Sequence, residues 1–338
     1  MRNKALFLGS VSLAAMTAAV VAVQAQDAVD NGYKVSVEGG ALFGPNDLAG
    51  DKLGGELIGI PLSSSGGTIT SDQHDNMGWR AAVAVQRQID PLWDMKFALA
   101  LNQQLETTNS LSFGATDISS SGDGSSISGL FESKTDFDYE TMDFEAGYSP
   151  EVDGPVNVRL FGGVRGLHYN DTYDKVGTVD GTEYSGGVVV DGSGTSGGYS
   201  FLQSGSFYGV GPRIGAEAST RLGDSMFGLT GSVAGSFILG RAQNNVNFEY
   251  DFSSGASGSP VPTGDISSEE WGWVTDFEAS LGVDFYVTDT NKLTIGGRVE
   301  KVTTLSDFSS EVFSSGSSGG DTNGRLTFGP TVKFEGAF

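Results

Sequence analysis

The sequence predicts an all-β chain: an antiparallel transmembrane β-barrel of about 10 strands, with short periplasmic turns and long extracellular loops. Three observations support this fold class. Segments of strand length alternate apolar and polar residues, the connections between them alternate short and long, and the last segment ends on an aromatic residue. Barrels cross membranes with tilted strands of about 9–11 residues whose outward faces are apolar. A soluble sheet shows the same two-residue period but has no reason to sort its connections by length.

Ten segments have the alternation of a strand with one apolar face. In the segment 79–85, Trp79, Ala81 and Val83 fall on one face and Arg80 on the other. The segment 137–148 changes phase, which predicts a β-bulge near Glu140. The ten expected strands are 33–43, 79–85, 95–103, 137–148, 156–164, 207–218, 227–239, 271–287, 293–299 and 325–338.

Two prolines and a set of aromatic residues refine this picture. Pro212 and Pro330 lie inside expected strands, and because proline lacks an N–H, each predicts a bulge or a strand end. Aromatic residues near strand ends predict girdles at the two membrane interfaces. The girdle candidates are Tyr33, Phe43, Trp79, Trp93, Tyr148, Tyr169, Trp271, Trp273 and Phe338.

The connections fall into two kinds. Short ones at 90–94, 149–155, 220–225 and 288–292 are rich in Asp, Gly, Pro and Asn, which favour turns. Long ones at 44–76, 106–136, 170–206, 243–270 and 306–323 are rich in Ser, Gly, Thr and Asp, and we expect solvated loops. The β-prone stretches 57–62, 68–70, 184–190 and 246–252 leave two alternatives open. They are strand extensions beyond the membrane, or extra hairpins that raise the strand number to 12 or more.

Both ends of the sequence predict export to the outer membrane. Arg2 and Lys4 precede the apolar stretch 5–23, and Val23-Gln24-Ala25 offers small residues for cleavage, so residues 1–25 are expected to be a cleaved signal peptide. The alternative is an uncleaved anchor helix. Residues 26–338 are then a single outer-membrane β-barrel. Its last strand carries Phe334 and Phe338, which resemble the C-terminal assembly signal that the outer-membrane barrel assembly machinery reads.

Composition limits the possible partners. The net charge of −23 disfavours nucleic acid, since there is no basic surface to neutralise phosphates. The long segments carry most of the negative charge, which predicts enrichment of cations at the outer mouth. Their carboxylates are also candidates for bridging through divalent cations to lipopolysaccharide, although no segment has the spacing of a dedicated calcium loop. No cofactor and no metal site is predicted.

One stretch resembles a known family. It runs Phe207-Tyr-Gly-Val-Gly-Pro-Arg-Ile-Gly-Ala-Glu-Ala and continues through Arg221-Leu-Gly to Gly240-Arg241. This stretch is similar to the Legionella-type major outer-membrane protein family, a group of pore-forming barrels. The resemblance covers roughly residues 205–242. It implies an outer-membrane barrel that passes small solutes, and it brings no catalytic residues.

If the apolar faces meet lipid, the opposite faces line the lumen. Ten charged residues are the candidates for selectivity: Arg80, Lys96, Arg159, Arg165, Arg213, Glu217, Asp276, Glu278, Arg298 and Lys333. Two interpretations stay open, a charged constriction that filters solutes and a lumen packed with ion pairs. Strand number does not decide between them, because about eight strands give a filled interior and about 16 give an aqueous channel.

The sequence therefore predicts a porin-like channel for passive diffusion of small hydrophilic solutes and ions, which is not an enzyme. One alternative is a structural or adhesin-type barrel with a plugged lumen, whose loops bind a partner. Another is a surface hydrolase that uses His168 with Asp171 or Asp174; His74 is the only other histidine. The expected partners are outer-membrane lipids and lipopolysaccharide, which Arg241 and Lys301 are placed to contact, and a homo-oligomer is possible.

Overall fold

The computed structural model describes residues 32–44, 68–72, 76–105, 107–118, 123–185, 188–189, 195–254, 263–303 and 324–337. Within these ranges the chain forms 13 strands, all joined in one antiparallel sheet. The same ranges contain no helix with the length and apolar character needed to cross a membrane. The predicted signal peptide and Phe338 lie outside the described residues.

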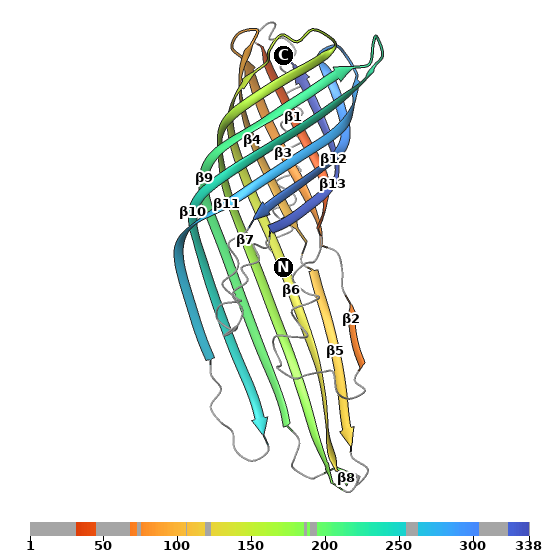
Figure 1. Cartoon of the computed structure of the whole chain (residues 1–338), viewed down its shortest axis with the longest axis vertical. Coiled ribbons are helices and arrows are strands. Elements are labelled where there is room, and N and C mark those ends of the chain that lie inside the picture. The colour runs from red at the N-terminus through yellow and green to blue at the C-terminus, as the bar shows by residue number, and fades with distance from the viewer. Residues whose placement is uncertain are drawn as a thin grey trace.

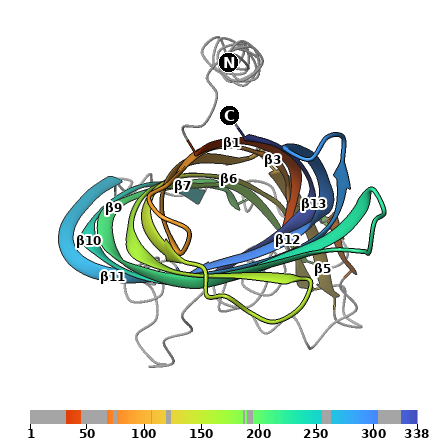
Figure 2. The ribbon, with the colours of Figure 1, turned by 90° about the horizontal axis from the view of Figure 1, so that it is seen from above.

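Ten of the described strands close into a barrel (Figure 2). Around the ring they follow the order β6-β4-β3-β1-β13-β12-β11-β10-β9-β7, and pairing of β6 with β7 completes the circle. The predicted ten-stranded antiparallel barrel is confirmed. The bounds are β1 (Tyr33–Gly44), β3 (Asn76–Gln88), β4 (Trp93–Gln104), β6 (Gly124–Tyr148), β7 (Val156–Ser185), β9 (Thr195–Arg221), β10 (Phe227–Ser254), β11 (Thr263–Tyr286), β12 (Asn291–Thr303) and β13 (Gly324–Ala337).

Five barrel strands continue far beyond one end of the ring (Figure 1). These strands, β6, β7, β9, β10 and β11, are 24 to 30 residues long, whereas the other five have 12 to 14. Beside β6, the strand β5 (Thr107–Ile118) replaces β4, and β2 (Thr68–Asp72) pairs with β5. A short strand, β8 (Val188–Val189), pairs with the end of β7.

This extension corrects the expectation of solvated loops. The stretch 246–252 lies inside β10, so of the two alternatives for the β-prone stretches, strand extension holds there. The reason is that neighbouring Ser-, Thr- and Gly-rich segments satisfy one another's backbone hydrogen bonds in a ladder, which composition does not reveal. The stretch 57–62 lies outside the described residues.

The other end of the barrel carries the short turns, as predicted. In the β3–β4 turn, the Asp90 carboxylate accepts hydrogen bonds from the backbone N–H groups of Leu92 (2.8 Å) and Trp93 (2.9 Å). Gly154 and Gly223 adopt positive φ angles of 129° and 59° in the β6–β7 and β9–β10 turns. Such conformations favour glycine, so local turn chemistry fixes this end of the barrel.

The predicted bulge near Glu140 is wrong. The β6–β7 ladder keeps one register from Tyr148↔Leu160 to Gly124↔Tyr184, and Glu140 pairs with His168 inside it. The apparent change of phase has another cause. Phe137 and Tyr139 are inward-facing and buried, so the strand keeps its alternation while the lumen changes from polar to aromatic.

Each in-strand proline interrupts one ladder without a bulge or a strand end. Between β1 and β13, Gly40 pairs with Thr331 and Phe43 with Phe328, and the two positions between them are unpaired. The β9–β10 ladder has the same gap beside Pro212, and its register is the same on both sides. A glycine precedes each proline, and a Cβ at Gly329 would collide with the Ala41 carbonyl oxygen. The missing N–H is therefore accommodated by close approach of the neighbouring backbone.

Substitution Gly329→Ala is expected to lower the free energy of unfolding by about 1–3 kcal/mol, because β13 must move away from β1. Gly297→Ala is the matched control, since the nearest atom to its added methyl group is 3.8 Å away. That control is expected to be neutral or to stabilise by about 0.4–1 kcal/mol. Thermal unfolding in detergent, followed by circular dichroism, measures both. Equal midpoints for the two variants would contradict the close approach.

The outward faces of the barrel strands are apolar and exposed. Ile214 and Leu281, each 71% exposed, lie on opposite sides of β10 in this wall. Toward the long-strand end, one row of directly paired residues crosses from β6 to β11: Glu140, His168, Tyr208, Arg241 and Trp271. A change from aliphatic to aromatic and charged side chains is typical of a membrane interface. Most girdle candidates in the described part of the chain face outward, some near the short turns and some near the long strands, but Tyr169 faces the lumen.

Candidate functional site in the barrel lumen

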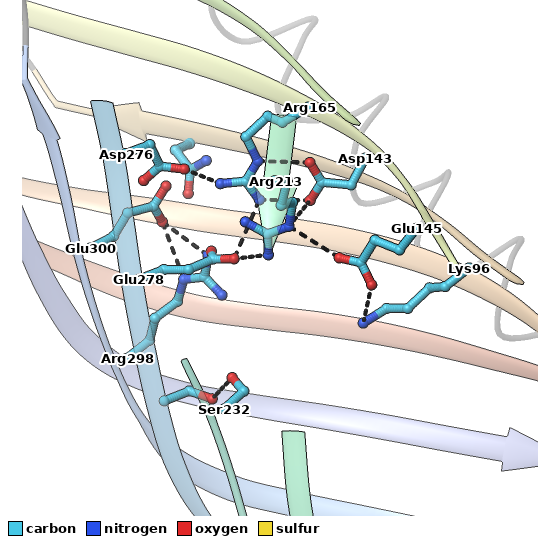
Figure 3. Close-up of polar contacts among 12 residues, drawn as sticks. Lys96, Asp143, Glu145, Arg165, Arg213, Ser232, Asp276, Glu278, Arg298 and Glu300 are labelled. Atoms are coloured by element: carbon cyan, nitrogen blue, oxygen red, sulfur yellow. Dashed lines mark hydrogen bonds and ion pairs between the residues drawn. The ribbon is translucent and has the colours of Figure 1, made fainter. Parts of the chain in front are cut away.

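Charged side chains from β4, β6, β7, β9, β11 and β12 meet in the lumen (Figure 3). The structure places each of the ten predicted selectivity candidates on the inward face of its strand, because inward and outward positions alternate as the sequence predicted. Whether these residues select solutes stays a prediction. What the structure adds is their pairing, which joins residues far apart in the sequence.

Arg165 of β7 is the most enclosed cation. Its side chain is only 2% exposed, and it donates to both oxygens of Asp143 at 2.7 and 2.6 Å. It also pairs with Asp276 and, at 3.4 Å, with Glu278 on β11. Such a bidentate, charge-assisted arrangement fixes the guanidinium plane and links β6, β7 and β11 across the lumen.

Arg213 and Arg298 extend this network around Glu278. Arg213 of β9 donates through Nε to Glu145 at 3.0 Å and through Nη2 to Glu278. Arg298 of β12 donates to the other oxygen of Glu278 and to Glu300 at 3.1 Å. One carboxylate of β11 thus holds guanidinium groups from strands on either side of it.

A second group lies nearer the short turns. Arg159 donates to Asp94 at 2.8 Å and to Glu145 at 3.1 Å, while the Lys96 ammonium contacts Glu217 at 2.8 Å. Phe161 packs under Arg159 and Arg213, with ring-centre distances of 5.0 and 5.5 Å. Cations over an aromatic face add stabilisation where water is largely excluded.

Further ion pairs lie at both ends of this cluster. Arg80 contacts Glu38 at 2.8 Å, and Lys333 contacts Glu335 at 3.2 Å toward the short turns. On the side of the long strands, Arg325 pairs with Asp171 at 2.9 Å. The charged layer, defined here by Arg159, Arg165, Arg213, Arg298 and their carboxylate partners, therefore continues around the lumen wall.

An aromatic layer lies beyond the charged layer, toward the long strands. It consists of Phe137, Tyr139, Tyr169 and Phe207, with Tyr169 and Phe207 stacked at 5.4 Å and 19°. Aliphatic neighbours complete this level, and none of the nine side chains is more than 4% exposed. The neighbours are Leu167, Ile238, Ala242, Val274 and Val302. At this level the nine side chains pack against one another and leave almost no surface to water.

Between the charged layer and the short turns the lumen contains a cavity of about 280 Å³, named here the vestibule. Its lining includes Gln88, Ser149 and Asn157, which lie next to the short turns, and Arg213, which lies in the charged layer. In outer-membrane barrels the short turns face the periplasm. The vestibule is therefore an aqueous space on the periplasmic side that ends at the ion pairs.

Sequence reasoning missed two parts of this site. Three acids that face the lumen were not expected there: Asp94, Asp143 and Glu300. Each lies two residues from an expected lumen residue on the same strand, namely Lys96, Glu145 and Arg298, and therefore points to the same side. The two-residue alternation of the strands was therefore sufficient to predict that these acids face the lumen. The aromatic layer was not expected at all, because an inward Phe or Tyr has the same sequence appearance as a lipid-facing one.

The suggested catalytic pair does not assemble. His168 lies on the outward face of β7 opposite Glu140, whereas Asp171 is on the inward face, where it holds Arg325. Asp174 shares the outward face but is six residues away along the strand, about 20 Å. His74 lies outside the described residues. The described residues thus contain no histidine beside either aspartate.

The closed antiparallel ring, with an apolar outer face and a charged lumen, defines the class of outer-membrane β-barrel proteins. The family described as Legionella pneumophila major outer membrane protein precursor matches residues 62–297. The chain belongs to this family, and the suspected resemblance is confirmed.

Other comparisons add only distant similarity. No curated protein matches the chain. Among solved structures, the Escherichia coli outer membrane protease OmpT is 12% identical, covering 91% of this chain and 97% of its own, with a TM-score of 0.43. A major outer membrane protein from Thermus thermophilus is 13% identical over 90% of this chain and 99% of its own, with a TM-score of 0.32. TM-scores this low indicate no function for the chain.

Proposed function

We propose that the protein is a porin-like channel for passive diffusion of small hydrophilic solutes and ions. The observation that carries this proposal is the charged layer, which spans the lumen at the end of the polar vestibule. Ion pairs are a poor choice for merely filling an interior, because well-packed apolar residues in their place are often equally or more stabilising. Charges of both signs in a lumen are, in contrast, suited to replacing the hydration of passing solutes.

The aromatic layer is the gate of this channel. A hydrophobic constriction blocks ions by excluding water even where its side chains are only loosely closed. Conduction then requires that Phe207, Tyr169 and their neighbours move apart. The protein needs no catalytic group for this role, and the outward position of His168 supports a protein without enzymatic activity.

A second candidate function is a structural barrel whose lumen stays plugged. It is favoured by the complete burial of the aromatic layer and by the low exposure of the ion pairs. In that case the long-strand extension would carry the function by binding a partner outside the cell. The two candidates differ in one measurable property, the passage of ions.

Single-channel recording in planar bilayers tests the proposal. The purified, refolded protein is expected to give small, uniform conductance steps, since ions must pass both the charged layer and the parted aromatic layer. Loss of the steps after heat denaturation of the same sample controls for detergent artefacts. A correctly folded barrel that stays silent over the usable voltage range would leave the structural barrel as the function.

A further inference from the structure

The vestibule has a charge balance opposite to that of the chain. Seven Lys or Arg residues line it against five Asp or Glu residues. In the whole sequence the corresponding numbers are 19 and 42. The residues that face the cavity are thus mainly positive inside a strongly acidic protein, while Glu145, Asp284 and Glu300 contact some of them from behind. A low-dielectric wall strengthens the field of the charges that face the cavity.

Arg213 at the inner end of the vestibule has an unused donor. Its side chain is 6% exposed, and two of its nitrogens, Nε and Nη2, are held by Glu145 and Glu278. The third, Nη1, is buried and has no hydrogen-bond partner. A buried donor without a partner is destabilising, so an acceptor that reaches it is stabilised there.

Lysines provide further donors toward the mouth. Lys333 lines the vestibule, its side chain is 31% exposed, and its only ion pair among the described residues is with Glu335 at 3.2 Å. Lys292, on the neighbouring strand β12, is held by longer contacts of 3.4 Å to Asp284 and 3.7 Å to Glu335. An ammonium group has three N–H donors, so both lysines keep capacity for another acceptor.

We propose that the vestibule is a binding site for one small oxyanion of the phosphate class, entered from the periplasmic side. Its volume is about 280 Å³, which is the volume that about nine water molecules occupy in the liquid at roughly 30 Å³ each. This is enough for such an ion with part of its hydration shell. Arg213 lines the vestibule with its Nη1 enclosed, so its side chain turns toward the cavity to bind the ion. Guanidinium groups match phosphate oxygens, and Lys333 binds the ion from the mouth.

Other occupants fit less well. A cation meets seven positive side chains, and a neutral solute gains nothing from the buried Nη1 beyond what water provides. Binding also does not require the barrel to conduct. A failure of this proposal and a failure of the channel proposal are therefore distinguishable in the same preparation.

Isothermal titration calorimetry of the folded barrel in detergent, with inorganic phosphate as the probe, tests the site. The wild-type protein is expected to bind one phosphate per chain, and chloride at equal ionic strength is expected to give no saturable heat. Arg213→Gln is expected to weaken phosphate binding at least tenfold. Equal responses to phosphate and chloride would show that only screening occurs, and this would overturn the proposal.

Lys333→Gln keeps the test decisive if Arg213→Gln fails to fold, because Lys333 is partly exposed at the mouth. It is expected to weaken phosphate binding about threefold or more. Arg221→Gln is the matched control, since Arg221 lies at the end of β9, pairs with the exposed Asp289 and does not line the vestibule. The proposal is wrong if Lys333→Gln binds phosphate as tightly as the control does.

Discussion

Arg165→Met is expected to lower the free energy of unfolding by about 3–5 kcal/mol, the usual cost of removing one partner from a buried ion pair. Asp276 would lose its guanidinium partner, and Asp143 would keep only the longer contact of 3.6 Å with Arg213. Both side chains stay enclosed, no more than 8% exposed. Methionine fills a similar volume, so the effect reports charge rather than a cavity. Thermal unfolding in detergent and the heat-dependent mobility of the folded barrel on gels measure it.

The control for this prediction is Arg221→Met. Arg221 also pairs with an aspartate, Asp289 at 3.3 Å, but the two side chains are 43% and 93% exposed. Exposed pairs contribute little, and the expected change is within about 1 kcal/mol. A double variant, Arg165→Met with Asp143→Asn, is expected to recover part of the loss, because one uncompensated charge is gone. Equal losses for Arg165→Met and Arg221→Met would mean that the charged layer is hydrated.

Phe207→Ala is expected to increase single-channel conductance several-fold and to lengthen open times. Phe207 is fully buried and stacks on Tyr169, so truncation opens space at the level that excludes water. The substitution also costs about 3–5 kcal/mol of stability. Folding must therefore be verified by heat-dependent gel mobility before the recording in planar bilayers.

Phe237→Ala is the matched control for this experiment. Phe237 lies on β10, points outward, is 44% exposed, and stacks on Trp273 at 5.6 Å and 22°. It loses the same side chain on the lipid side of the wall, and its conductance is expected to equal that of the wild type. If both variants conduct alike, the aromatic layer is not the gate.

Much of the barrel wall was predictable, because the alternation of apolar and polar residues is visible within each strand by itself. Two-residue alternation located all ten barrel strands, and the Asp, Gly, Pro and Asn clusters located the short turns. The same alternation predicted that Arg80, Arg165 and Glu278 face the lumen. The family assignment followed from one glycine-rich strand pair around Arg213.

The rest depends on long-range pairing. That Arg165 meets Asp276, 111 residues away, follows from how the strands stagger around the ring, and alternation does not encode the stagger. The aromatic layer was mistaken for a bulge, because Phe137 and Tyr139 are inward at a level where the lumen is apolar. The extensions were expected to be loops, because their Ser, Thr and Gly content outweighed short β-prone runs such as 246–252.

The extension has little of its own to define how its strands align. Its strands are rich in Ser, Thr and Gly and bury few apolar side chains, Val246 among them, so a slip by one residue costs less there than in the wall. In the barrel wall the same slip would turn Arg213 toward lipid and Ile214 into the charged lumen. The β9–β10 ladder nevertheless keeps one register from Gly228↔Arg221 in the wall to Ser254↔Thr195 at its far end. The membrane-embedded half thus acts as a template that holds the exposed half in alignment.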